Sequence, residues 1–130
     1  MKSMFLLAAL LFAVALSSAS SAANKANDVK KQKAVIQFTQ PVEVLGVTLK
    51  GEYLFVHDDA AMMRGEACTF IYKGTAEVAS KLVVSFHCAP AGRAKVGSFT
   101  VRTEQIAPEV TALREFQFAG DKEAHVVPSK

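Results

Sequence analysis

The fold is decided by residues 68–88, which read CTFIYKGTAEVASKLVVSFHC. Apolar residues recur at every second position on both sides of a polar connection, a pattern typical of two half-buried strands joined as a hairpin. One register of this hairpin opposes three pairs of similar side chains: Tyr72 with Val84, Phe70 with Phe86, and Cys68 with Cys88. Directly opposed β carbons lie about 4.5–5.5 Å apart, which is near disulfide reach. The stretch therefore predicts a hairpin closed by a Cys68–Cys88 disulfide.

The same alternation extends outward from the hairpin through most of the chain. Turn residues such as Gly46 and Pro108 separate the apolar segments, and only residues 60–63 and 76–81 have room for a helical turn. The expected strands cover residues 34–44 with an interruption at Pro41, 47–57 with a bulge or bend at Lys50 and Gly51, 68–72, 82–88, 99–103 and 110–119, with a short one near 125–127. We predict a single all-β domain over residues 34–127, an antiparallel sandwich or partly open barrel of six or seven strands with an aromatic-rich core.

The beginning of the chain indicates export. Lys2 precedes an uncharged apolar run from Met4 to Leu16, and small residues follow up to Ala23. This is the pattern of a secretory signal peptide, and the run is shorter than the roughly 20 residues that a membrane-spanning helix needs. We expect a signal peptide at residues 1–22, a flexible leader at 23–33, and a periplasmic or secreted mature chain without a transmembrane segment.

The charge is too small to favour nucleic acid as a partner. The formal net charge is +3, and the lysines gather only at Lys25, Lys30, Lys31 and Lys33, in the predicted leader. A nucleic-acid binder normally carries a clustered basic stripe and a larger excess. The leader lysines are expected to be a solvated tail, with an arm that docks on an anionic partner as the alternative.

The two cysteines allow a second interpretation. In an exported chain a cysteine pair favours a structural disulfide. The alternative is a pair of free thiols that bind a metal ion or act as a redox couple. Because His87 and Cys88 are consecutive on a predicted strand, their side chains point to opposite faces and cannot readily bind one ion together.

Histidines and methionines offer an alternative metal site. His57, Met62, Met63 and His125 supply the soft and borderline ligands that copper favours, although the chain has no paired-histidine or CxxC spacing. A single imidazole on a strand is more often a structural or surface group. We therefore predict no metal ion or other cofactor, and keep these four residues as the ligands of the alternative.

Motifs for catalysis are absent from the sequence. There is no GxSxG elbow and no phosphate-binding loop, and Ser85 near His87 lacks an obvious third group to orient the imidazole. The carboxylates Asp58, Asp59 and Glu66 lack the spacing of a calcium loop. We predict that the protein is not an enzyme, with a small secreted hydrolase as the weaker alternative.

Four segments resemble those of a group of small exported bacterial β-proteins of uncharacterised function. These segments are LKGEYLFVHDD at residues 49–59, MRGEAC at 63–68, SFHC at 85–88 and EFQFAG at 115–120. The resemblance implies a setting in the bacterial cell envelope or outside the cell, and it assigns no catalytic or binding residue.

These observations together predict a small exported β-domain that binds an unknown protein or supports an envelope component. The alternative is a periplasmic protein that binds copper or zinc. The candidate surface combines polar residues and methionines that lack a role in the core: His57, Asp58, Asp59, Met62, Met63, Arg64, His87 and His125.

Overall fold

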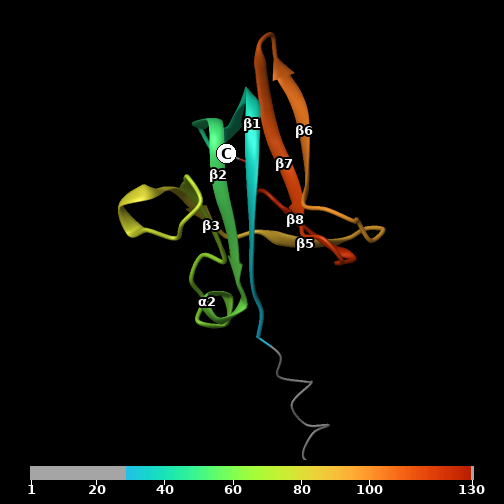
Figure 1. Ribbon diagram of the computed structural model, residues 1–130. Coiled ribbons are helices and arrows are strands. Elements are labelled where there is room, and N and C mark those ends of the chain that lie inside the picture. The colour runs from blue at the N-terminus through green and yellow to red at the C-terminus, as the bar shows by residue number, and fades with distance from the viewer. Residues whose placement is uncertain (1–28, 130) are drawn as a thin grey trace, which may run out of the picture.

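The computed structural model describes residues 29–129, which form one mixed β-sheet curled into a half-barrel (Figure 1). The strands are β1 (Lys31–Val44), β2 (Val47–Asp58), β3 (Thr69–Lys73), β4 (Leu82–Phe86), β5 (Ala89–Gly92), β6 (Thr100–Ala107), β7 (Val110–Gln117) and β8 (Glu123–Val126). The order across the sheet is β4-β3-β2-β1-β7-β8-β5, and β6 pairs with β7 off this path. The predicted all-β, partly open barrel is confirmed. The strands number eight instead of six or seven, and β1 meets β7 in parallel orientation.

Strands β1 and β2 form a long hairpin at the middle of the sheet. Their antiparallel register runs from Lys31 opposite Asp58 to a tight turn in which Leu45 and Gly46 have φ values of 48° and 86°. Two consecutive positive φ values match the twist of a two-residue hairpin turn. The ladder slips around Pro41, which has no N–H to donate, and the slip bends the hairpin.

The predicted hairpin of β3 and β4 exists, but its register was wrong by one residue. Phe70 lies opposite Ser85, whereas the prediction placed it opposite Phe86. The connection at residues 74–81 contains the short 3-10 helix η1 (Ala79–Lys81) and is not a symmetric turn, so the pairing shifts. Both cysteines consequently lie just outside the ladder, one before β3 and one after β4.

Only two residues, His87 and Cys88, connect β4 to β5, although these strands lie at the two ends of the sheet path. Three steps between Cα atoms reach at most roughly 11 Å. The two ends of the sheet must therefore come close together, and the sheet has to curl. Strand β8 pairs with both β5 and β7 and so lies beside the place where the ends approach.

An aromatic core fills the inner face of the curled sheet. Phe55 and Phe116 are fully buried and meet edge to face, with ring centroids 5.3 Å apart. The other large members of this core are Phe38, Leu49, Tyr53, Ile71, Phe86, Leu113 and Phe118. Phe70 and Tyr72 pack instead with Leu54 and Val56 on the other face of the sheet. Strand alternation explains the separation, because successive side chains point to opposite faces.

A buried polar network holds the turn that precedes β8. The Gln117 side chain is fully buried and donates hydrogen bonds to the carbonyl oxygens of Ala94 and Asp121, at 2.9 and 2.7 Å. Glu115 accepts charge-assisted hydrogen bonds from Arg93 and Arg102, and the Arg93 guanidinium is the main reason that the pKa of Glu115 lies below its usual range. These bonds fix where the chain enters β8.

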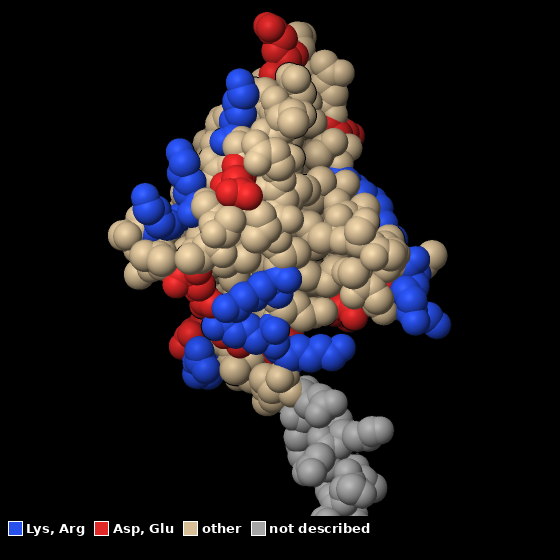
Figure 2. All heavy atoms as spheres, in the orientation of Figure 1, with Lys and Arg blue, Asp and Glu red and all other residues tan. Residues whose placement is uncertain are grey.

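The predicted signal peptide at 1–22 lies outside the described residues, as does most of the predicted leader. The leader prediction extended too far, because Lys31, Gln32 and Lys33 already belong to β1 and pair with β2. Between residues 29 and 129, no helix has the length and apolarity needed to cross a bilayer. Basic and acidic side chains both appear on the face drawn in Figure 2. Glu77 forms ion pairs with both Lys31 and Lys33.

The aromatic core should dominate stability. We expect F116A to lower the free energy of unfolding by about 3–5 kcal/mol, because it leaves a cavity among rings that cannot collapse around it. Chemical denaturation measures the change. The matched control is V35A on the same sheet, whose side chain is exposed and should change stability by under about 0.5 kcal/mol. Equal losses in both variants would contradict this description of the core.

Candidate metal centre

Three side chains from separate parts of the fold converge where the half-barrel closes. His57 lies near the end of β2, His125 lies in β8, and Cys88 lies in the connection between β4 and β5. One donor atom from each residue lies within 4.8 Å of the other two. Both imidazoles are only 3% exposed. The two histidines are therefore part of the protein interior, and Cys88 is half-buried beside them.

Strand alternation directs the two histidines inward. His57 follows Tyr53 and Phe55 at two-residue intervals on β2, and all three are buried on the core side of the sheet. His125 lies opposite Phe116 in the β7–β8 ladder and stacks on its ring, with centroids 5.1 Å apart. The aromatic core thus continues directly into the imidazole pair, which it holds in place.

The two imidazoles lie against each other. Their ring centroids are 4.0 Å apart and the ring planes are inclined by 31°. Burial lowers the pKa of His57, against the opposing pull of Asp59 and other nearby carboxylates. Burial and the charge that His57 would carry lower the pKa of His125 to about 4. Both rings are therefore neutral at neutral pH, and neutral imidazole is the form that binds metal ions.

Two buried nitrogens in this pair have no hydrogen-bond partner among residues 29–129. They are Nδ1 of His57 and Nε2 of His125. Asp59 Oδ1 lies 3.4 Å from His57 Nδ1 but forms no hydrogen bond with it. Buried polar atoms are nearly always paired, so an unpaired one needs an explanation. A ligand that accepts the lone pair of such a nitrogen would provide the missing partner.

The predicted disulfide was wrong, because Cys68 and Cys88 are free thiols in the structure. Their Sγ atoms are 2.9 Å apart, whereas a disulfide bond measures about 2.05 Å. The shifted register explains the difference: the cysteines are not a directly opposed ladder pair, and the Cys88 N–H donates a 3.3 Å hydrogen bond to Cys68 Sγ. The sulfurs are neighbours as expected, but as thiols they are available as ligands.

The Cys88 thiol faces the histidines. Its Sγ lies 3.7 Å from Nδ1 of His125. Burial, followed by the contact with Cys68, raises the pKa of Cys88 to about 12, so without a bound cation the thiol keeps its proton. A bound metal ion reverses this preference, since a coordinating thiol is deprotonated outright.

Two cavities meet at the histidine pair. The larger, of about 440 Å³, is polar and is lined by Lys30, Gln32, His57, Asp59, Asp121, Lys122, Glu123 and His125. The smaller, of about 110 Å³, is lined by His57, Met62, Cys88, Pro90, Glu123 and His125. Both rings are thus reachable from outside despite their burial, and carboxylates line the wider cavity.

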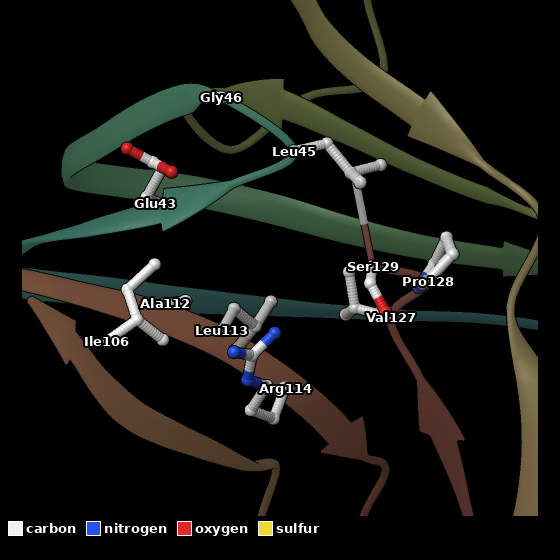
Figure 3. Close-up of a pocket in the computed structure, with 10 residues that line it drawn as sticks. All are labelled: Glu43, Leu45, Gly46, Ile106, Ala112, Leu113, Arg114, Val127, Pro128 and Ser129. Atoms are coloured by element: carbon white, nitrogen blue, oxygen red, sulfur yellow. The ribbon is translucent and has the colours of Figure 1, made fainter.

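Another cavity, of about 230 Å³, lies at the opposite end of the β1–β2 hairpin (Figure 3). It is mainly apolar, with Leu45 and Ile106 among its lining residues. Its lining residue Arg114 is already paired with Glu104 through a 2.8 Å hydrogen bond. This cavity brings together no set of groups with an evident chemistry.

Three residues of the predicted candidate surface, Asp58, Arg64 and His87, have separate roles. Asp58 caps the short helix α2 (Asp59–Met63) by accepting hydrogen bonds from two backbone N–H groups. Arg64 forms an exposed ion pair with Glu66. His87 is exposed and points away from the cluster that contains its neighbour Cys88, as strand alternation predicted. These three residues do not form a common site.

Three of the four residues of the alternative metal set lie around one cavity in the structure. The structure brings together His57, His125 and Met62, but Met63 is 74% exposed and is not among the residues that line the small cavity. Sequence reasoning kept Cys88 as a metal ligand only in a free-thiol pair with Cys68, and did not combine it with His57 and His125. The signal that could have found it is the inward direction that alternation gives Cys88, opposite to His87.

No protein-family model, curated protein or solved structure significantly matches this chain.

Acid should destabilise the metal-free protein through the buried histidine pair. His125 titrates at about 4 when folded and near 6.5 when unfolded, so between these pH values the unfolded chain binds a proton that the folded chain does not. The stability contributed by its neutral ring is present above the unfolded pKa and is lost as the pH falls toward 4. The loss for this shift is about 3 kcal/mol.

Denaturation of chelator-treated protein at a series of pH values measures this effect. We expect H125F, whose ring can still stack on Phe116, to lose less stability than the wild type over the same range. H87Q is the matched control, because His87 is exposed and lies outside the pair. An unchanged acid dependence in H125F would show that other groups, such as the carboxylates, cause it.

Proposed function

We propose that this protein binds a transition-metal ion through His57, Cys88 and His125. The observation that supports the proposal is the convergence of two buried imidazoles and a thiol, with donor atoms within 4.8 Å of one another. The unpartnered Nδ1 of His57 adds to it, because coordination would satisfy a buried polar atom that otherwise weakens the fold.

The spacing of the donors is close to that of a coordination sphere. With metal–nitrogen bonds of about 2.0–2.1 Å and metal–sulfur bonds of about 2.3 Å, donor atoms in a tetrahedral site lie roughly 3.3–3.7 Å apart. The sulfur of Cys88 and Nδ1 of His125 are already 3.7 Å apart. Only the distances from the His57 nitrogen to the other two donor atoms, which are within 4.8 Å, would have to shorten. Small side-chain rotations can shorten them.

The types of donor atom restrict which metal ion the site can bind. Imidazole and thiolate suit zinc and copper, whereas calcium and magnesium require oxygen ligands. Three protein donors leave a position open for a further ligand. We place this binding role in the periplasm or outside the cell, on the basis of the predicted signal peptide, and assign the protein no catalytic activity.

Metal titration tests the proposed function. Protein prepared without an affinity tag, reduced and kept anaerobic, should bind one equivalent of Zn²⁺ or Cu⁺. Replacing any one donor (H57Q, C88S or H125Q) should weaken binding by at least the roughly 10–100-fold that loss of an outer-shell partner costs. Thermal unfolding provides a second readout, because saturation at about 100 times Kd should raise stability by about 2.7 kcal/mol.

The control uses the remaining histidine of the chain. H87Q also removes an imidazole next to Cys88, but His87 is exposed and lies outside the cluster, so its affinity should equal that of the wild type. Absence of binding by the wild type, or an equal loss in H87Q, would overturn the proposal.

A further inference from the structure

We propose that the bound ion is copper in its Cu(I) state and that the thioether of Met62 is its fourth ligand. This inference rests on the proposed metal-binding function and specifies its ligand. Met62 lines the same cavity of about 110 Å³ as His57, Cys88 and His125. The site therefore offers two imidazoles, one thiolate and one thioether.

The start of α2 holds Met62 near the cluster. Asp58, the residue after His57, caps this helix through hydrogen bonds from the N–H groups of Ala60 and Ala61. The Asp59 N–H donates to the carbonyl oxygen of Lys30, and Ala61 is buried. The helix is thus attached both to the end of β2 and to the chain leading into β1. One short, anchored turn carries the thioether to the cavity.

The exposure of Met62 supports a role other than packing. Its side chain is 47% exposed although it borders a cavity lined by buried histidines. A methionine that only filled core space would be buried in a protein whose core is otherwise built from aromatic and branched residues. A flexible thioether at the mouth of the cavity can instead reach an ion held by the three deeper donors.

The chemistry of the donor set favours copper over zinc. Zinc sites use cysteine, histidine and carboxylate ligands, whereas a thioether added to two histidines and a cysteine is characteristic of copper. The second thiol, Cys68, lies 2.9 Å from Cys88 Sγ and adds another soft sulfur to the surroundings. The second free thiol favours the reduced ion, because two Cu(II) ions would take one electron each from the Cys68–Cys88 pair, which would become a disulfide with loss of two protons.

One carboxylate competes with this assignment. Glu123 lines the same cavity, and a carboxylate oxygen is a zinc ligand. A site completed by Glu123 would prefer zinc, and E123Q would lower its zinc affinity. A site completed by Met62 would lose Cu(I) affinity when the thioether is removed. Replacing Glu123 and replacing Met62 therefore distinguish the two arrangements, because the first change would lower zinc affinity and the second Cu(I) affinity.

The experiment compares M62L with M63L in anaerobic competition against a chromophoric Cu(I) chelator, with zinc titrated in parallel. Leucine conserves volume and apolarity, and Met63 is the adjacent, 74% exposed methionine that provides the matched control. We expect M62L to weaken Cu(I) binding roughly tenfold and to leave zinc binding unchanged. M63L should change neither, and urea unfolding should show that both variants are folded. X-ray absorption of the Cu(I) protein should detect two sulfur ligands in the wild type and one in M62L.

The possible results separate this inference from the function on which it rests. If the wild type binds neither ion, the metal-binding function itself is wrong. If binding needs the three donors but M62L binds Cu(I) like the wild type, only the copper assignment is overturned. Two sulfur ligands retained in M62L would assign the second sulfur to Cys68, and a zinc loss in E123Q with a wild-type preference for zinc would assign a zinc site.

Discussion

The connection between β4 and β5 is the constraint on which the rest of the structure depends. His87 and Cys88 alone must carry the chain from one end of the sheet path to the other. A flat sheet of seven strands, each about 4.8 Å from the next, would place those ends far beyond the reach of two residues. The sheet therefore curls, encloses the aromatic core, and brings Cys88 against histidines from β2 and β8.

The candidate site continues the aromatic core, but its rings are imidazoles instead of phenyl rings. The rings of Phe55, Phe116, His125 and His57 follow one another in contact, from the centre of the core to the cavities. The carbon rings are stabilised by burial, but burial of the imidazoles leaves two nitrogens unpaired. Burial of the His57 and His125 imidazoles thus lowers stability locally, and it leaves both rings neutral, held in place and reachable through the cavities.

Much of the fold could be predicted from the sequence, because alternation at every second residue is a local property. It correctly located most strands and the separation of His87 from Cys88. The register of β3 and β4 could not be predicted, since it depends on how η1 and the bends around it shorten the connection. The parallel contact of β1 with β7 also depends on long-range packing and has no local signal.

The candidate site was predictable only in part, for the same reason. Residue types selected His57, Met62 and His125 as ligands of the alternative site, but the distance between β2 and β8 is set by the closure of the sheet and cannot be read from spacing. The disulfide prediction located the two sulfurs near each other, but it and its free-thiol alternative both paired Cys88 with Cys68 and not with the histidines. A one-residue shift in register was enough to leave this sulfur free to face the histidines.

Metal binding and the closure of the half-barrel should therefore be energetically coupled. The three donors belong to β2, to β8 and to the connection that joins the two ends of the sheet. An ion held by all three binds the closed sheet and has no equivalent site in the unfolded chain, so its binding free energy adds to folding stability. The proposed ligands and the constraint that curls the sheet meet in one residue, Cys88, because the two-residue connection between β4 and β5 also supplies the proposed sulfur ligand.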